Sequence, residues 1–458
     1  MSIATHVFKA YDIRGLVDGE LTEELAYYIG HAYLQVLKEK GFDIDGKKLV
    51  VGYDMRETSI AFKNQIAKAW QQAGVDVVDV GLSTTPTCNF AAAHYDDHVG
   101  AIMITASHNP SEYNGFKLVM QDGLPIGKHN GMDRIKELVV EQFVHKAQQE
   151  GSLEQKNIMD DYLAHVFSLV SASSMGSKKI VIDYGNGIGS VAMKLFLAKL
   201  PQIEVISMYE KPDGSFPNHE ANPLKLDTLI ALQDKVKEVQ ADFGIALDGD
   251  ADRIGLVDNN GEIVEASFVG ALYGLEVLRK TPKSHMLYDL RSSQSVKELW
   301  EAAGATTGKS VVGHALIKKM MKDNDAVFAS ELSLHLYFKD MYGVESSEYA
   351  LGLLLAILAR EEKSVSELVS PMKKYFHSGE LNFEVDDKAA AIARVQQAFG
   401  GSANEHSDLD GLWLGFDWGW FNIRQSNTEP VLRLNLEAWS EKEMGEKVEE
   451  VKKMIMSN

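Results

Sequence analysis

A serine and a histidine stand together in a short polar stretch, residues 105–110 (Thr-Ala-Ser-His-Asn-Pro). The apolar run at residues 101–104 precedes it, and Asn109 with Pro110 favours a turn, so the pattern predicts a buried strand that ends in a loop. Open α/β sheets place their chemistry in such loops. Ser107 and His108 would then lie where a phosphoryl group can be held. The alternative is plain turn chemistry, because Ser and Asn side chains also bond their own backbone.

Three aspartates at alternate positions, Asp248, Asp250 and Asp252, follow a second apolar run at residues 243–247. Carboxylates on a strand-ending turn can converge on one hard cation, and Mg²⁺ accepts such ligands while leaving room for phosphate oxygens. The calcium EF-hand pattern does not fit, because Arg253 stands where that loop requires glycine. A solvated acidic turn is the alternative. Arg253 argues against it, since a guanidinium suits phosphate.

Polar and apolar side chains alternate along residues 329–335. This pattern predicts an extended segment with Glu331, Ser333 and His335 on one face. A carboxylate, a hydroxyl and an imidazole on one face suit sugar hydroxyls. The alternative is an edge strand that turns its polar side to water.

A fourth polar stretch, residues 424–430 (Arg-Gln-Ser-Asn-Thr-Glu-Pro), packs a guanidinium, two hydroxyls and an amide into one loop. These groups match the hydrogen-bond donors of a phosphate cradle. The alternative is a polar turn between the alternating strand around Trp418 and Trp420 and the strand at residues 432–436.

Together the four stretches resemble the α-D-phosphohexomutase superfamily, the phosphomannomutase/phosphoglucomutase enzymes. They stand in the order and spacing of that family and cover essentially the whole chain, and residues 8–15 and 113–117 resemble two further family signatures. The resemblance implies an α/β protein of four domains around a central cleft. Three are similar α/β/α mixed-sheet domains, and the fourth is a smaller α+β C-terminal domain.

The chain also shows a repeated opening. Residues 47–54 resemble residues 178–184, and residues 285–289 are a looser copy, as expected of repeated α/β units. After Pro371 the pattern changes to alternating, aromatic-rich strands. We therefore expect domains at residues 1–153 with the serine loop, 154–260 with the aspartate loop, 261–372 with the sugar loop and 373–458 with the phosphate loop.

The resemblance implies reversible phosphoryl transfer between hexose 1-phosphate and hexose 6-phosphate. Ser107, carried as phosphoserine, gives its phosphoryl group to the hexose 1-phosphate. The hexose 1,6-bisphosphate intermediate then reorients and returns its other phosphoryl group to Ser107. One Mg²⁺ is expected on Asp248, Asp250, Asp252 and a phosphoserine oxygen of Ser107.

The resemblance also implies roles for further residues. Glu331, Ser333 and His335 are expected at the sugar. By this resemblance, proton transfer or orientation falls to His108, Lys117 and Arg14. The sequence does not decide which of the three transfers the proton. The groups expected to contact substrate phosphates or supply local positive charge are Tyr11, Arg253, Arg291, His314, Arg424, Ser426, Asn427 and Thr428.

The chain departs from the family pattern at several positions. Ser330 and Leu334 stand where glycine is usual, which predicts a narrower or reshaped sugar pocket. Val311 and Arg291 stand where lysine is common. These changes bear on sugar preference more than on reaction type.

Mannose is the favoured sugar and glucose is a second possibility. The glucosamine branch more often has glycine in place of Asn427, and phosphoglucosamine mutase is the alternative. Two other classes stay open: a metal-dependent sugar-phosphate phosphatase and an inactive sugar-phosphate binder.

The composition of the chain limits the binding partners that we expect. A net charge of −20 over 458 residues argues against nucleic acid or anionic membrane as a partner. The single cysteine, Cys88, excludes an internal disulfide and fits a reducing cytosol. The first residues carry no apolar signal core, and the longest apolar run, residues 350–359, is too short to span a bilayer. We therefore expect a cytoplasmic protein that binds small sugar phosphates, and its oligomeric state stays open.

Overall fold

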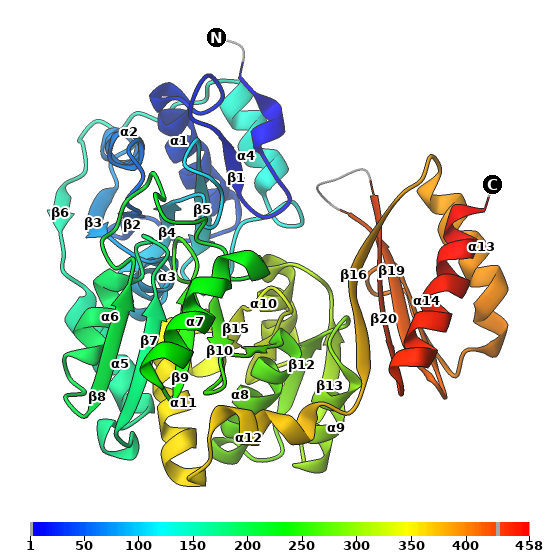
Figure 1. Cartoon of the computed structure of the whole chain (residues 1–458). Helices are drawn as coiled ribbons and strands as arrows, with labels where there is room; N and C mark the ends of the chain where they lie inside the picture. Colours follow the sequence, from blue (N-terminus) through cyan, green and yellow to red (C-terminus); the bar gives the residue numbers. More distant parts are fainter. Residues whose placement is uncertain (1–2, 427–430, 458) are drawn as a thin grey trace. The chain divides into compact units, whose positions relative to one another are not determined.

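The repeated openings become the middle strands of three parallel triplets in the computed structural model, which describes residues 3–426 and 431–457 (Figure 1). β2 lies between β3 and β4, β7 between β8 and β9, and β12 between β13 and β14. At each of these strand ends an aspartate accepts a hydrogen bond from the backbone N–H two residues later; the three aspartates are Asp54, Asp183 and Asp289. The repeat in the sequence is therefore a repeat in local structure. The middle strands are β2 (Lys48–Tyr53), β7 (Lys178–Asp183) and β12 (His285–Asp289).

The chain divides into two compact units. The first comprises residues 1–264 and 333–366, and the second comprises residues 265–332 and 367–458. The first unit holds two mixed sheets, and in the second lie the triplet around β12 and an antiparallel sheet.

The first sheet of the first unit has the strand order β1-β5-β4-β2-β3-β6. Successive residues of β2 point to opposite faces. Leu49 and Val51 pack with α1, α2 and α4, and Val50 packs with α3. Helices therefore cover both faces, as in an α/β/α domain. The strands are β1 (Ile13–Leu16), β3 (Asp76–Leu82), β4 (His98–Ile104), β5 (Tyr113–Met120) and β6 (Leu153–Gln155), and the helices are α1 (Glu23–Glu39), α2 (Ser59–Gln72), α3 (Thr85–His94) and α4 (Met132–Val140).

The second sheet of this unit has the order β11-β10-β9-β7-β8. α7 packs on it through Leu232 and Val236, which contact Val181 of β7. The apolar run at residues 350–359 lies in the buried helix α11, as predicted. Among the described residues, no helix is both long and apolar enough to cross a membrane. The remaining elements are β8 (Ile203–Met208), β9 (Phe243–Leu247), β10 (Ile254–Val257), β11 (Ile263–Val264), β15 (Leu336–Phe338), α5 (Met159–Leu169), α6 (Ser190–Leu197), α7 (Ile230–Val239) and α11 (Ser347–Glu361).

In the second unit, the terminal antiparallel sheet has the order β16-β20-β19-β18-β17. Its core includes Val395 of α13 and Val451 of α14, and Figure 1 shows these two helices on the same side of the sheet. The predicted α+β character after Pro371 is thus present. The elements are β13 (Thr306–Ser310), β14 (Phe328–Ser330), β16 (Phe376–Glu384), β17 (Glu405–Ser407), β18 (Leu412–Phe416), β19 (Gly419–Gln425), β20 (Val431–Ala438), α8 (Ala266–Lys280), α9 (Gln294–Ala302), α10 (His314–Asp323), α12 (Val365–Val369), α13 (Lys388–Phe399) and α14 (Glu441–Met456).

The predicted domain limits at residues 153, 260 and 372 stay predictions. The contacts divide the chain into two units, and part of the expected third domain, residues 333–366, falls in the first of them. β6, which pairs with β3, spans the first predicted limit.

One buried histidine of the first unit makes stability depend on pH. His31 lies fully buried in α1, and burial, followed by His145 and Lys146, lowers its pKa to about 4. The unfolded chain therefore binds one more proton than the native chain between about pH 6.5 and pH 4, so stability falls on acidification. We expect about 1 kcal/mol lost per pH unit from this group. Melting temperatures at pH 7 and pH 5 should differ less for His31→Gln than for the wild type. The exposed His406→Gln serves as control. An unchanged difference in His31→Gln would contradict this assignment.

Candidate functional site

Ser107 lies in the predicted loop that follows β4 in the sequence, and it is 2% exposed. Its backbone adopts φ +50°, a left-handed conformation that is uncommon outside glycine. The backbone N–H of Ser107 donates to Thr105 Oγ1 at 2.9 Å. Its hydroxyl donates to Asp248 Oδ2 at 2.7 Å and lies 3.1 Å from Nδ1 of His108. Ser107 therefore contacts the aspartate loop directly.

Arg56 holds the serine loop in this shape. Its guanidinium donates to the carbonyl oxygens of Ser107, Asn109, Pro110 and Tyr113. The guanidinium also pairs with Asp54, with Nε 3.3 Å from Oδ2. Arg56 is not among the residues that the sequence predicts for the site. The repeat offered a signal, because an arginine two residues after the strand-ending aspartate recurs in the third copy as Arg291.

The three aspartates of the second loop are buried and face the serine loop. Asp248 Oδ1 accepts the N–H groups of Asp252 and Arg253, which tightens the turn. A Cβ atom at Gly249 would lie 2.3 Å from the carbonyl oxygen of Ser107, so the two loops meet this closely only with glycine there. Thr85 holds the carboxylate of Asp250, the middle aspartate, because Thr85 Oγ1 donates to Asp250 Oδ2 at 2.5 Å.

Lys117 of β5 is the cation that faces the aspartates. Its Nζ lies 2.6 Å from both Asp250 Oδ2 and Asp252 Oδ2. Burial lowers the pKa of Lys117, but Asp250 and Asp252 raise it by more, so the ammonium stays charged. Burial, with the carboxylates of Asp252 and Asp250, raises the pKa of Asp248 well above its ordinary value. Burial also acts to raise the pKa of Asp252, but Lys117 and His335 hold it well below its ordinary value.

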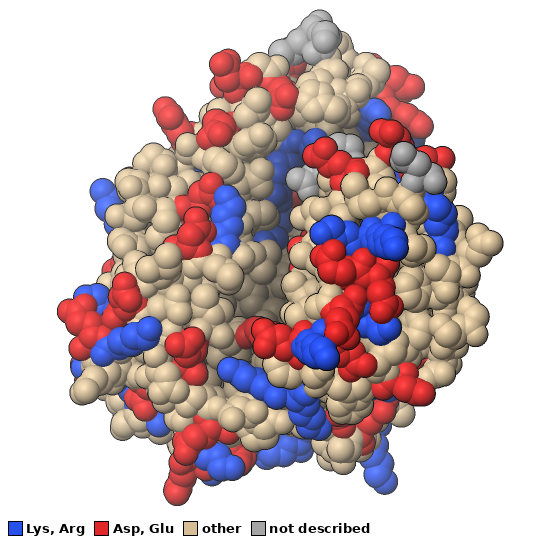
Figure 2. Space-filling view, turned by 45° about the vertical axis from the view of Figure 1, so that its right-hand side comes forward, with Lys and Arg blue, Asp and Glu red and all other residues tan. Residues whose placement is uncertain are grey.

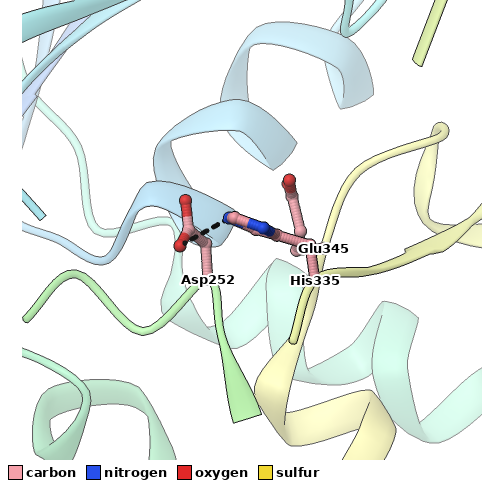
Figure 3. Close-up of side chains that lie close together, drawn as sticks. All are labelled: Asp252, His335 and Glu345. Atoms are coloured by element: carbon pink, nitrogen blue, oxygen red, sulfur yellow. Dashed lines mark ion pairs between the residues drawn. The ribbon is translucent and has the colours of Figure 1, made fainter. Parts of the chain in front are cut away.

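The aspartate triplet fits a hard metal ion. Oxygen atoms of Asp248, Asp250 and Asp252 lie within 4.8 Å of one another. Asp250 Oδ1 is buried and accepts no hydrogen bond, which leaves a ligand atom available. An all-oxygen set of this kind suits Mg²⁺ or a similar cation. A second buried group, Asp252, His335 and Glu345, shares one aspartate with the triplet (Figure 3).

Two further cations, Arg14 and Arg253, lie near the serine in the first unit. Arg14 donates to Asn109 Oδ1 at 2.7 Å, and Arg253 Nε lies 3.8 Å from Asp248 Oδ2. Removal of the His108 ring from solvent, with the nearby Arg253 and Arg14, lowers the pKa of His108 well below its ordinary value. Lys117 acts on His108 in the same direction. The imidazole is therefore neutral at pH 7. Tyr11 lies in the bend before β1.

In the second unit, three guanidinium groups gather around Glu380 of β16. Glu380 Oε2 lies 3.1 Å from Arg291 Nη1 and 3.2 Å from Arg424 Nη2, and Glu380 Oε1 lies 2.9 Å from Arg433 Nη1. Burial raises the pKa of Glu380, but these arginines lower it by more. Three planar cations held this close suit an anionic ligand. Glu380 is not among the residues that the sequence predicts for the site.

The remaining residues predicted to bind phosphate in this unit are His314, Ser426, Asn427 and Thr428. His314 is the first residue of α10, directly after Gly313. Ser426 follows β19, and its N–H donates to the carbonyl oxygen of Val431 at 3.0 Å. Asn427 and Thr428 lie outside the described residues.

Comparison with known proteins gives one consistent result. Residues 5–143, 160–261, 267–375 and 380–454 match, in order, the alpha/beta/alpha domains I, II and III and the C-terminal domain of the phosphoglucomutase/phosphomannomutase family. A phosphomannomutase from Salmonella montevideo is 38% identical over 440 residues, 94% of each chain. The chain belongs to this family. The predicted four-domain α/β class and the predicted class of enzyme, an isomerase of the phosphohexose mutase type, are thereby confirmed.

Solved structures agree. A phosphoglucomutase/phosphomannomutase family protein from Burkholderia thailandensis has a TM-score of 0.89 and 30% identity, covering 100% of this chain and 99% of that chain. The fold is shared more distantly by an N-acetylphosphoglucosamine mutase from Aspergillus fumigatus in complex with GlcNAc-6P and magnesium. That structure has a TM-score of 0.62 and 14% identity, and covers 98% of this chain and 95% of that chain.

The expected extended segment at residues 329–335 is wrong. β14 ends at Ser330 and a turn follows, in which Leu334 has φ +68°. The turn breaks the alternation, so the three polar residues do not share one face of a strand. Glu331 Oε1 accepts the N–H of Gly313 at 2.9 Å. His335 Nε2 instead lies 3.2 Å from Asp252 Oδ1, and its Nδ1 is 2.7 Å from Ser333 Oγ.

The two residues that replace the family's usual glycines in this loop are buried. A Cβ atom at Gly270 in α8 would lie 2.5 Å from Ser330 Oγ, so Ser330 packs closely against that helix. Leu334 is 7% exposed and lies against Gly255 of β10. Its left-handed backbone is one that glycine adopts without cost, which accounts for the usual glycine. Both side chains are thus packed inside the protein, and the narrower or reshaped sugar pocket stays a prediction.

Positive charge in this acidic protein is concentrated locally. Figure 2 shows acidic and basic side chains intermixed over the face in view. By contrast, Arg14, Lys117 and Arg253 in the first unit all lie near enough to His108 to lower its pKa. In the second unit, Arg291 and Arg424 both donate to the carboxylate of Glu380.

Proposed function

We propose that this protein interconverts hexose 1-phosphate and hexose 6-phosphate through a phosphoserine at Ser107, with hexose 1,6-bisphosphate as the intermediate. The contact that supports this most is Ser107 Oγ to Asp248 Oδ2, 2.7 Å, which sets the nucleophile beside an all-carboxylate metal site. Family membership sets the reaction class.

In the proposed reaction, the 6-hydroxyl of hexose 1-phosphate attacks phosphoserine 107. A new O–P bond forms, the P–Oγ bond breaks, and the hydroxyl proton passes to a base. After reorientation, Ser107 Oγ attacks the phosphorus of the phosphate on carbon 1, and the bond between that phosphorus and the sugar oxygen breaks. The base returns its proton to the sugar oxygen, which frees hexose 6-phosphate and restores the phosphoserine. The lowered pKa of His108 suits an orienting role better than that of a base, whereas Lys117 stays charged and is suited to stabilise the migrating group.

Asp248, Asp250 and Asp252, with a phosphoserine oxygen, would hold Mg²⁺. When bound there, the ion would supply Lewis-acid polarisation of the phosphoryl group and would offset its negative charge. Arg14 and Arg253 would orient the reacting phosphoryl group, and Arg291, Arg424, His314, Tyr11 and the residues 426–428 would bind the other phosphate. Glu331 and Ser333 would contact sugar hydroxyls. His335, whose ring nitrogens lie near Asp252 Oδ1 and Ser333 Oγ, stays part of the proposed substrate site.

Mannose is the sugar that we propose, with glucose also accepted, because the Salmonella montevideo relative is a phosphomannomutase. The Aspergillus fumigatus structure contains GlcNAc-6P and magnesium, which supports a sugar phosphate and Mg²⁺ as the ligands. No feature favours glucosamine. The buried thiol of Cys88 fits a reducing compartment, and we propose the cytoplasm.

Turnover of mannose, glucose and glucosamine 1-phosphates, each with Mg²⁺ and a trace of the matching 1,6-bisphosphate, tests this function. We expect the 6-phosphate as product, fastest from mannose 1-phosphate. Release of free phosphate without isomer would identify a phosphatase. Tight binding without turnover, with Ser107 phosphorylated, would identify an inactive binder.

Arg424→Ala tests the phosphate cradle. Loss of a charge-assisted hydrogen bond to phosphate costs about 2 kcal/mol, so KM should rise roughly 30-fold while kcat changes less. Steady-state kinetics on mannose 1-phosphate measure both. The control is Arg394→Ala in the same terminal sheet domain, where Arg394 only bonds the carbonyl oxygens of Met454 and Ile455. An unchanged KM in Arg424→Ala would count against the cradle.

A further inference from the structure

We propose that Glu380 is a positioning residue of the phosphate cradle and that it acts through Arg424 and Arg433. This inference rests on the proposed role of Arg424 in binding the phosphate that does not react. It adds Glu380, which belongs to none of the four stretches that carry the family resemblance. The carboxylate holds the guanidinium groups close together, so that they meet one phosphate jointly.

The two arginines face each other across the terminal sheet. Arg424 of β19 and Arg433 of β20 are directly opposed partners. Their neighbours Ile423 and Leu432 belong to the core that includes residues of α13 and α14, so the two arginines point to the other face of the sheet. Like charges directly opposite each other destabilise a sheet. The pair therefore calls for a counter-charge on its own face.

A bulge in β16 turns Glu380 toward this pair. The pairing of β16 with β20 shifts by one residue between His377 and Glu380, and Glu380 then faces Asn435. Gly379, directly before it, has φ +70°, a left-handed conformation that suits glycine and is typical of such a bulge. In a regular ladder Glu380 would face Leu434, on the apolar side of the sheet. The bulge thus places the carboxylate on the face of the arginine pair.

Glu380 contacts both arginines without using up the donors of Arg424. Its Oε2 lies 3.2 Å from Arg424 Nη2, and its Oε1 lies 2.9 Å from Arg433 Nη1. A guanidinium carries five N–H donors. The Nε of Arg424 is buried and, within the described part of the chain, donates to no acceptor. Arg424 therefore keeps donors for a phosphate while Glu380 holds it.

Arg291 fixes the carboxylate of Glu380 from the end of β12. Its Nη1 lies 3.1 Å from Glu380 Oε2. Its Nε lies 3.0 Å from Asp289 Oδ1, and its Nη2 lies 2.5 Å from Asp289 Oδ2. Two carboxylates thus hold the guanidinium of Arg291, and Glu380 joins the arginine pair of the terminal sheet to a cation that is already anchored.

The charge of Glu380 is what the cradle requires. Burial raises its pKa, but Arg291, Arg424 and Arg433 lower it by more, so the carboxylate is ionised at pH 7. Without this charge, the guanidinium groups repel one another at close range. They would separate, and a phosphate would meet fewer of them at once. An uncharged side chain at this position should therefore weaken substrate binding more than the chemical step.

The test compares Glu380→Gln with a matched control, Glu384→Gln. Glu384 lies on the same strand but is exposed, opposite Val431. Steady-state kinetics on mannose 1-phosphate, with Mg²⁺ and a trace of the 1,6-bisphosphate, give KM and kcat, and thermal melts report the fold. The same change made in Arg424→Ala completes a double-mutant cycle, which shows whether the two residues act together.

We expect KM of Glu380→Gln to rise about 10-fold, with a smaller change in kcat, and Glu384→Gln to match the wild type. In the Arg424→Ala background, Glu380→Gln should change KM by less than about 2-fold. Glu380→Asp keeps the charge but has a shorter reach, so it should show a smaller rise, and it carries the test where Glu380→Gln does not fold.

An unchanged KM in Glu380→Gln, even with a lower melting temperature, would overturn the positioning role. A lower KM would overturn it as well, since it would show that the carboxylate competes with phosphate for the arginines. An equal rise in the Arg424→Ala background would show that Glu380 does not act through Arg424. A wild type that forms no hexose 6-phosphate would overturn the proposed function itself.

Discussion

Ser107→Ala is expected to lose mutase turnover by on the order of 10⁴-fold or more while the fold is retained. The variant lacks the oxygen that is proposed to carry the phosphoryl group. Alanine fits the same buried place and loses the hydroxyl contacts with Asp248 Oδ2 and His108 Nδ1. Rates of mannose 6-phosphate formation and circular dichroism measure the two effects.

Ser111→Ala is the matched control for this change. Ser111 belongs to the same loop, but it is exposed and its hydroxyl faces Glu112. It should keep normal turnover. Near-normal rates in Ser107→Ala would show that Ser107 carries no phosphoryl group.

Asp248→Asn should abolish both Mg²⁺ activation and the stabilisation that Mg²⁺ gives. The pKa of Asp248 is raised by burial and by Asp252 and Asp250, so an uncharged side chain suits the metal-free protein. We therefore expect little loss of stability without metal. At a Mg²⁺ concentration 100 times the Kd, the wild type should gain about 2.7 kcal/mol, and the variant nothing.

Thermal melts with and without Mg²⁺ test this, with Asp258→Asn as control. Asp258 is also buried, but it accepts only N–H groups of its own turn, at Asn260 and Glu262. Its variant should keep the shift in melting temperature with Mg²⁺. An equal shift in Asp248→Asn and the wild type would place the metal elsewhere.

The strand-to-loop junctions of the site are readable from sequence. The apolar runs at residues 101–104 and 243–247 end β4 and β9, and the polar residues behind them form the serine and aspartate loops. Local patterns do not predict that these two loops contact each other, because Ser107 and Asp248 are 141 residues apart in the sequence. The resemblance to a family predicted that contact, and no periodicity did.

Other parts of the site depend on tertiary contacts that leave no local signal. Alternation predicted an extended segment around Ser333, but contacts in both units hold a turn there, with Leu334 in a left-handed conformation. Glu380 looks like an ordinary acidic residue until folding brings three guanidinium groups to it. Arg56 could have been predicted, because it occupies the same position in the repeated opening as Arg291.

Transfer of the phosphoryl group from Ser107 to sugar is the most direct measurement of the central claim. The enzyme is first labelled with radioactive phosphate from hexose 1,6-bisphosphate, freed of excess label, and mixed with unlabelled mannose 1-phosphate and Mg²⁺. We predict label on Ser107 before mixing, then loss of that label with matching appearance in mannose 1,6-bisphosphate and its products. Label that stays on the protein while mannose 6-phosphate accumulates would contradict the account.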